Sequence, residues 1–179
     1  VMRRGLFTNP SLVNLLDKSL APGKAIEPHT GEVMPLWRLA ETAQNRDQTF
    51  AIFAGERYGM GSSRDWAAKG QYLIGVSIVF ASSFERIHRA NLVGMGIVPL
   101  RLAKSDHPTS LDLTSNDRVA IKIDLHTLTP DQQTVASIIR DGVVQRKLTV
   151  TVEVKTSAEI SQLRAGGILP MILEQSCVS

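Results

Sequence analysis

The residues best suited to chemistry lie in a glycine-rich segment that reads Tyr58-Gly-Met-Gly-Ser-Ser-Arg-Asp65. Glycines let a backbone approach a ligand closely, and the first amides of a following helix point outward without partners. Such a turn binds anions, and Arg64 could add a bidentate grip on a carboxylate. On spacing alone, an ordinary helix start capped by Ser62 or Ser63 explains the pattern equally well. Both interpretations stay open at this level.

Three better-known motifs do not fit this segment. A phosphate-binding P-loop needs lysine after its last glycine, and here Gly61 is followed by Ser62. A dinucleotide fingerprint needs a third glycine at the position that Arg64 occupies. A nucleophile elbow needs a glycine two residues after its serine, which neither Ser62 nor Ser63 has. The sequence therefore excludes these three sites.

To bind an anion in this way, the glycine-rich segment must lie between a strand and a helix. Residues 50–54 form a short apolar run of strand type, and residues 66–70 indicate a short helix closed by Gly70. The remaining predicted elements are a helix after Pro35, strands at 76–81, 97–102 and 119–123, a hairpin over 135–154 that turns at Asp141-Gly142, and a helical stretch from Ala158 to about Glu174 with an interruption at Gly166-Gly167. Together these elements predict an α/β domain of mixed topology.

Three local features carry predictions of their own. Ser83 is expected to cap the helix that follows strand 76–81. Pro99 indicates an edge position or a bulge for its strand, because proline cannot donate a hydrogen bond to a ladder. The prolines and glycines within residues 17–33 predict a loop.

Composition sets the outer limits. The chain has 179 residues, of which 43% are hydrophobic, so one domain with a substantial core is expected. The formal net charge of +3 is compatible with an anionic substrate or with RNA, and the basic residues are scattered rather than gathered in runs. No apolar run approaches the length of a membrane span, and no signal-peptide pattern opens the chain. The first residue, Val1, suggests a piece of a longer protein, with a natural small subunit as the alternative.

Cysteine and histidine usage limits metal chemistry. Cys177 is the single cysteine, which excludes an internal disulfide framework and fits a reducing compartment, so a cytoplasmic location is expected. One thiol cannot hold an iron–sulfur cluster, which needs several thiolates. His88 lies between Arg86 and Arg89 near a predicted helix start, and we expect a hydrogen-bonded structural or interdomain role for it. The other histidines lack metal-ligand spacing.

Four blocks of this sequence resemble the C-terminal swivel domain of the aconitase superfamily. They occur in the expected order and cover nearly the whole chain: Arg4-Gly-Leu-Phe-Thr-Asn9, residues 58–70, residues 83–100 and Gly166-Gly-Ile-Leu-Pro170. The resemblance implies a mixed three-layer β/β/α swivel domain over residues 1–179, with a barrel-like sheet flanked by short helices. It also implies that the cluster-binding domains are absent from this chain.

The family resemblance implies a hydro-lyase of the aconitate hydratase type. Such an enzyme interconverts citrate and isocitrate through cis-aconitate, as in the tricarboxylic acid cycle. Its [4Fe–4S] cluster would be bound by other domains or by a partner subunit, so this chain would contribute no cofactor or metal ligand. On its own, without the cluster-bearing domains, the chain is expected to be inactive.

The family's site residues carry over onto four positions. By motif position Ser62 is the base that removes a proton beside a substrate carboxylate. Ser63 and Arg64 would hold one carboxylate, and Arg4 would hold another from the opposite side. A serine hydroxyl is a poor base, so these roles require backbone amides that stabilise the alkoxide and arginines that neutralise the developing charge.

Departures from the family pattern leave the substrate open. Pro-Ser-Leu-Val follows Asn9 where aconitase relatives carry an Ile-Arg-Leu run, and residues 17–33 lack an expected glycine pair. Relatives that act on 2-methylcitrate share the serine–arginine turn. Isopropylmalate dehydratase small subunits usually have Arg-Glu-His where this chain has Arg64-Asp-Trp66, which favours the aconitase side. An RNA-binding module is the alternative from another class, but no arginine-rich or aromatic-interleaved patch supports it.

Overall fold

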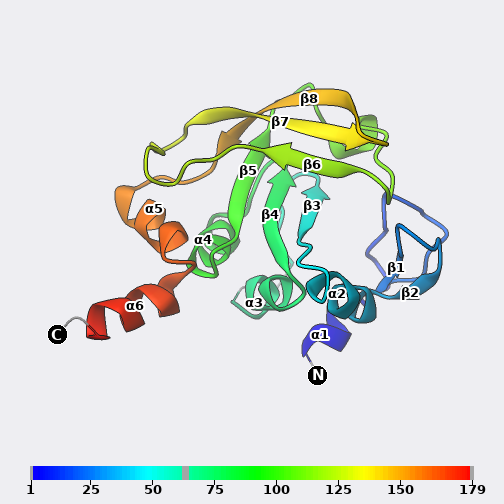
Figure 1. Cartoon of the computed structure of the whole chain (residues 1–179), viewed down its shortest axis with the longest axis horizontal. Helices are drawn as coiled ribbons and strands as arrows, with labels where there is room; N and C mark the ends of the chain where they lie inside the picture. The colour runs from blue at the N-terminus through cyan, green and yellow to red at the C-terminus, as the bar shows by residue number, and fades with distance from the viewer. Residues whose placement is uncertain (1, 62–64, 178–179) are drawn as a thin grey trace.

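The computed structural model describes residues 2–61 and 65–177, and its elements alternate between strands and short helices (Figure 1). The helices are α1 (Met2–Gly5), α2 (Leu36–Gln44), α3 (Asp65–Leu73), α4 (Arg86–Gly94), α5 (Ser157–Arg164) and α6 (Ile168–Cys177), with a single 3₁₀ turn at Pro108–Ser110. The strands are β1 (Lys24–Ile26), β2 (Val33–Pro35), β3 (Phe50–Ala54), β4 (Val76–Ala81), β5 (Val98–Leu102), β6 (Arg118–Ile121), β7 (Gln133–Arg140) and β8 (Val143–Val152). Within these described ranges, no helix is long and apolar enough to cross a membrane.

Six strands form one mixed sheet in the order β3-β4-β5-β8-β7-β6. Strands β3, β4 and β5 are parallel, and α3 and α4 make the crossovers between them. The remaining pairs are antiparallel, so the sheet changes character where β5 meets β8. In Figure 1 the β6–β8 part extends over the upper ends of β3 and β4, while helices α2 to α4 lie at their lower ends.

Two apolar clusters explain this layering. One cluster joins Phe80 and Leu100 of the parallel strands to side chains of β7, β8 and α5, such as Ile138 and Val150. The other packs the opposite side of the parallel strands, including Val79, against α2, α3 and α4. Burial on both sides explains why β4, apart from Ser77, is an apolar run rather than an alternating one. The mixed three-layer α/β architecture expected from the sequence is confirmed.

The long hairpin turns where the sequence predicts. Asp141 and Gly142 join β7 to β8, with φ values of 51° and 77°. Two successive positive φ values are the signature of the turns whose twist matches a right-handed hairpin, and Asp-Gly supplies them at low steric cost. The strongest short-range signal in the second half of the chain is therefore confirmed.

Two helix boundaries differ from the sequence-based predictions. Gly70 lies inside α3 rather than after it, and the chain leaves the helix at Gly75, whose φ is +85°. The cap of α4 is Glu85, whose side chain accepts a hydrogen bond from the His88 backbone N–H at 2.8 Å. Ser83 instead accepts a hydrogen bond from the backbone N–H of Arg57. The prediction for Ser83 was wrong because a residue two positions later caps the helix.

Two strand predictions also need correction. Pro99 lies in β5, which is an interior strand between β4 and β8, so it marks neither an edge nor a bulge. Its carbonyl accepts a hydrogen bond from the Glu153 backbone N–H at 2.9 Å. The predicted loop over residues 17–33 contains β1, which pairs with β2 in a separate two-stranded sheet.

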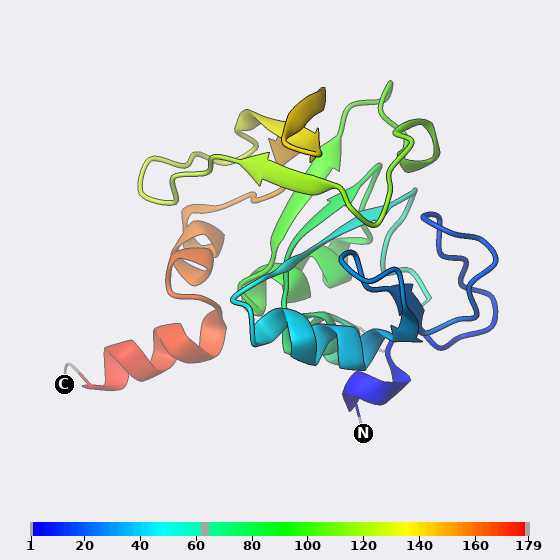
Figure 2. The ribbon, with the colours of Figure 1, turned by 45° about the vertical axis from the view of Figure 1, so that its right-hand side comes forward.

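In Figure 2 the C-terminal helices α5 and α6 follow one another at the end of the chain, in orange and red. A close backbone contact and an ion pair attach them to the α4 region. A Cβ added at Gly96, where φ is +75°, would lie 2.5 Å from the carbonyl oxygen of Gly166. Arg89 of α4 forms a bidentate pair with Glu159 of α5, at 2.9 and 2.7 Å. The turn that joins α5 to α6 is thereby held against the end of α4.

Glu27 determines the acid sensitivity of the β1–β2 region. Its carboxylate is 3% exposed and accepts hydrogen bonds from the backbone N–H groups of His29 and Thr30 and from Arg46. Burial alone would raise the pKa of Glu27, but these donors outweigh it and lower the pKa from 4.5 to about 2. A depressed pKa stabilises the fold above the unfolded-state value, and this stabilisation disappears as the pH falls toward 2.

We therefore expect Glu27→Gln to make the free energy of unfolding less dependent on pH in the acidic range. The free energy of unfolding, measured by chemical denaturation at several pH values, should fall less steeply below pH 4.5 in the variant than in the unmodified protein. The reason is that glutamine has no proton to take up. Parallel curves for the two proteins would show that Glu27 is not the group involved.

Candidate functional site

Three of the four site residues predicted from the sequence, Ser62, Ser63 and Arg64, lie outside the residues that the structure describes. The structure does describe what leads into and out of them. The chain leaves β3 at Ala54, runs through residues 55–61 and begins α3 at Asp65. The segment thus connects the carboxyl end of a parallel strand to the start of a helix, as the sequence indicates.

Arg4, the fourth predicted residue, is exposed on α1 and lies against α2. Its guanidinium carbon is 4.9 Å from the centroid of the Trp37 ring, which is cation–π distance. A pocket of about 360 Å³ opens beside this pair, lined by Met2, Arg3, Arg4, Trp37, Glu41 and Leu73. Leu73 is the last residue of α3, so the described contacts place Arg4 beside the C-terminal end of that helix. The lining therefore combines two arginines with one carboxylate, that of Glu41.

The first half of the glycine-rich segment is fixed to the residues that precede α4. The Tyr58 backbone N–H donates to the Ser83 carbonyl at 2.9 Å, and the Glu85 N–H donates to the Tyr58 carbonyl at 2.9 Å. The Arg57 N–H donates to Ser83 Oγ at 2.8 Å. These bonds bridge two loops that follow neighbouring strands, β3 and β4. They show why Ser83 is needed as a loop anchor rather than as a helix cap.

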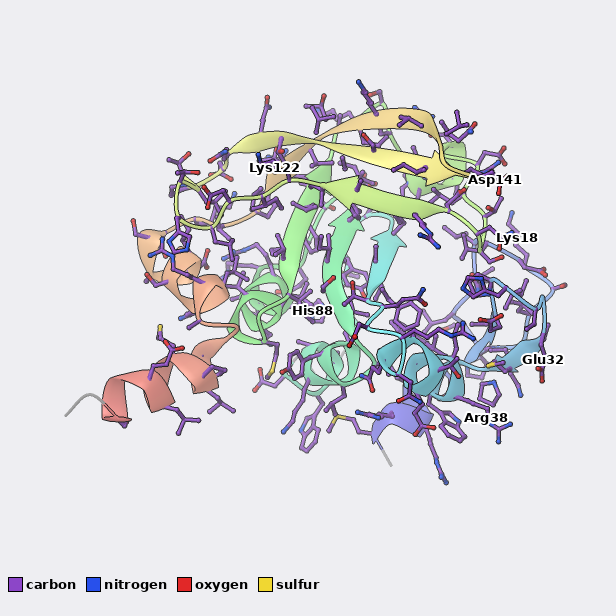
Figure 3. All side chains as sticks on the ribbon, in the orientation of Figure 1. Lys18, Glu32, Arg38, His88, Lys122 and Asp141 are labelled. Atoms are coloured by element: carbon purple, nitrogen blue, oxygen red, sulfur yellow. The ribbon has the colours of Figure 1, made fainter. Side chains whose placement is uncertain are left out.

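Three polar side chains meet next to this segment: the buried Gln71 and His88 and the half-buried Tyr58. Figure 3 labels His88 among them. Gln71 Nε2 lies 3.4 Å from His88 Nε2, and the rings of Tyr58 and His88 meet edge to face with centroids 5.3 Å apart. Burial raises the pKa of the Tyr58 hydroxyl, and the neighbouring Gln71 side chain opposes that shift only in part. Tyr58 is therefore a neutral phenol and not a base at physiological pH.

Sequence reasoning found only one member of this group. His88 was expected to have a structural or interdomain role, and the structure places it in the interior at 1% exposure. Gln71 and Tyr58 were missed, because nothing in the local pattern marks a glutamine inside a short helix as a neighbour of a histidine 17 positions later. Only the packing of α3 against α4 brings them together.

A second pocket, of about 410 Å³, lies at the carboxyl ends of β3, β4 and β5. Its lining combines both charges with hydroxyls: Glu56, Ser82, Ser83, Arg101, Leu102, Ala103, Lys104, Gln133, Thr149 and Thr151. Arg101 is ion-paired with Glu153, so its charge is already compensated. Arg4, the one predicted site residue that the structure describes, does not line this pocket.

No metal centre is formed by the residues 2–61 and 65–177. No group of three or more histidine, cysteine, aspartate or glutamate side chains within these ranges is arranged to hold an ion.

Comparisons with known proteins agree with the sequence blocks. Residues 1–105 match the family model described as the aconitase C-terminal domain. The chain is 40% identical over 173 residues to phosphinomethylmalate isomerase of Streptomyces viridochromogenes, covering 97% of this chain and 19% of that protein. It is 39% identical over 176 residues to aconitate hydratase A of Legionella pneumophila, and 38% over 175 residues to that of Bacillus subtilis. Both matches cover 98% of this chain, and 20% and 19% of the respective proteins.

The chain thus spans about a fifth of the length of the curated relatives it matches. Among solved structures, 3-isopropylmalate dehydratase (leuD) from Methanocaldococcus jannaschii aligns with a TM-score of 0.46 at 22% identity. That alignment covers 72% of this chain and 65% of the other.

Proposed function

Because this chain belongs to the aconitase C-terminal domain family, we propose that it is the swivel domain of an iron–sulfur hydro-lyase of the aconitate hydratase type. The observation that carries the proposal is the match of 97–98% of this chain to relatives that include aconitate hydratases, at 38–40% identity. The complete enzyme would interconvert citrate and isocitrate through cis-aconitate. This chain would be inactive without the cluster-bearing domains and would work in the cytoplasm.

In this proposal Ser62 is the base, Ser63 and Arg64 hold one substrate carboxylate, and Arg4 holds another. The turn's position before α3 supports these roles, since the free amides and the dipole at a helix start favour an anion by about 0.3–2 kcal/mol. Arg4 fits its role because it is exposed and lines a pocket with a second arginine, Arg3. Binding a substrate carboxylate at Arg4 would require the substrate to reach the Trp37 side of α1 or the arginine to turn away from it.

The residues of this chain do not fit the [4Fe–4S] cluster that the family uses. The sequence has one cysteine, whereas such clusters are held by several thiolates. No metal-binding group exists in the described part of the chain either. The cluster would therefore be held by other domains of the same polypeptide or by a large subunit, where it supplies Lewis acidity to the substrate hydroxyl.

The substrate class is a tricarboxylic or related hydroxy acid. Similarity alone does not choose within that class, since a phosphinomethylmalate isomerase and aconitate hydratases are almost equally similar to this chain. The Asp65-Trp66 pair after the arginine turn favours the aconitase side over isopropylmalate dehydratase small subunits. Citrate and isocitrate are the substrates that we propose.

The test is turnover by the complete protein, with its cluster loaded and its cluster-bearing domains present in whichever chain encodes them. Formation of the unsaturated acid is followed by absorbance with citrate, isocitrate, 2-methylcitrate, isopropylmalate and phosphinomethylmalate as separate substrates. The highest kcat/KM should be seen with citrate or isocitrate. A preference for another of these acids would keep the reaction class and correct the substrate, whereas no turnover of any of them by a fully loaded protein would refute the proposal.

A further inference from the structure

Two buried side chains, Gln71 and His88, and the half-buried Tyr58 come from segments on both sides of the serine turn in the chain. Tyr58 precedes Ser62 by four positions, and Gln71 lies in the helix that follows the turn. His88 comes from α4 and contacts both of them. Figure 3 shows His88 in the interior of the molecule, where α3 and α4 approach the parallel strands. A single imidazole therefore joins the segment that enters the turn to the helix that leaves it.

Gly59 makes this contact with its backbone. Its φ is +94°, and a Cβ built there would lie 2.3 Å from His88 Cγ and 2.4 Å from His88 Cβ and Cδ2. Such distances are far below any van der Waals contact, so the backbone of Gly59 rests directly on the imidazole. Three residues later the chain reaches Ser62. The ring of His88 is thus the surface on which this part of the segment lies.

The Gln71 contact fixes the orientation of that ring. Gln71 Nε2 lies 3.4 Å from His88 Nε2, so the two side chains are within hydrogen-bond distance across the contact between α3 and α4. Gln71 is 3% exposed and His88 is 1% exposed, so water does not compete for this contact.

We propose that His88 is a positioning residue for the serine base, an inference that rests on the function proposed above. Its ring contacts Tyr58 and Gly59 on one side and Gln71 of α3 on the other, so it links the two segments that flank the serine turn in the sequence. His88 does not act on the substrate itself, because it is buried and its Nε2 is directed at Gln71. Proton transfer depends steeply on geometry, and a misplacement of about 1 Å can cost about 10²-fold in rate.

The test compares two substitutions at His88 in the complete, cluster-loaded protein. Gln places an amide near the position of Nε2 and keeps the side-chain atoms next to Gly59, whereas Asn is too short to reach Gln71. We expect His88→Asn to lower kcat by about 10- to 100-fold with KM changed less than about 3-fold, and His88→Gln to recover most of that loss. His126→Asn, at an exposed histidine, is the matched control and should leave both constants unchanged.

A second readout separates a failure of this inference from a failure of the proposed function. Amide hydrogen exchange in His88→Asn should rise in peptides covering residues 55–65 and stay unchanged in the β7–β8 hairpin. If the unmodified protein turns over none of the acids, the function is wrong, and the exchange pattern still reports on the positioning contact. Unchanged kcat in His88→Asn overturns the inference, and so does unchanged exchange in residues 55–65.

Gly59→Ala tests the same contact from the other side, in case His88→Asn does not fold. The added Cβ must displace either the ring or the loop, so we expect a loss of kcat similar to that of His88→Asn. Gly31→Ala is its control, since Gly31 also has a positive φ, +71°, but a Cβ there meets nothing within 4 Å. A Gly59→Ala protein with the kcat of Gly31→Ala would contradict the proposal.

Discussion

Ser62→Ala in the complete, cluster-loaded protein is expected to lower kcat by at least about 10²–10⁴-fold, to below detection in an ordinary assay. The substitution removes the only group that the proposed mechanism uses to accept the substrate proton. The substrate should still bind, because the arginines and the cluster-bearing domains are unchanged. The loss should therefore appear in kcat, with substrate binding retained in a direct titration.

The control for this variant is Ser105→Ala, which removes an exposed hydroxyl from the turn after β5. Both proteins should contain the same amount of iron and sulfide per chain, because a lower cluster content would also lower kcat and could be mistaken for loss of the base. Near-normal kcat in Ser62→Ala would exclude this serine as the base. A large loss in Ser105→Ala would show that the assay reports on folding rather than on proton transfer.

Arg89→Met is expected to destabilise this domain by about 3–5 kcal/mol, the usual cost of removing one partner from a buried ion pair. The Arg89 and Glu159 side chains are 11% and 17% exposed, and two hydrogen bonds join them. Arg89 also donates to the Glu153 carbonyl at 2.8 Å. Burial alone would raise the pKa of Glu159, but the hydrogen bonds and charges of Arg89 and Lys155 together hold the pKa below its ordinary value. Without the arginine, this partly buried carboxylate loses its ion-pair partner and keeps the hydrogen bond from the Lys155 backbone N–H, at 2.7 Å.

Chemical denaturation followed by circular dichroism measures this loss, and the double variant Arg89→Met/Glu159→Leu is its informative control. Removing both charges should cost less than Arg89→Met alone, because no carboxylate is left without its ion-pair partner. Since the pKa of Glu159 is depressed in the folded state, the stability it contributes should be complete above pH 4.5 and fall below it. A double variant that is less stable than Arg89→Met would contradict this account of the α4–α5 contact.

The strands and the hairpin could be predicted because local sequence determines them. The β-branched run in β4 and the Asp141-Gly142 turn each favour one structure strongly. The interior position of Pro99 could not be predicted, because it depends on β8 returning from 50 residues later to pair with β5. The cap of α4 was predicted wrongly for a similar reason. The Ser83 hydroxyl accepts a hydrogen bond from the Arg57 backbone N–H, and Glu85 caps the helix instead.

The candidate site likewise has a part that local sequence determines and a part that depends on tertiary packing. The motif that contains Ser62 and Arg64 can be recognised in the sequence because its residues are consecutive. The contacts of Tyr58, Gln71 and His88 cannot be recognised in the sequence. These residues come together only through the packing of α3, α4 and the intervening strand. Arg4 is an intermediate case, since its motif is local but its stacking on Trp37 depends on where α1 meets α2.

The most direct test of the central claim, that this chain supplies the base to a cluster-bound hydroxy acid, is the turnover of the complete protein beside the same protein without residues 1–179. Both are loaded to the same cluster content and given citrate or isocitrate. We expect cis-aconitate formation only by the complete protein, with substrate still perturbing the spectrum of the cluster in both. Comparable turnover by the protein that lacks this chain would contradict it.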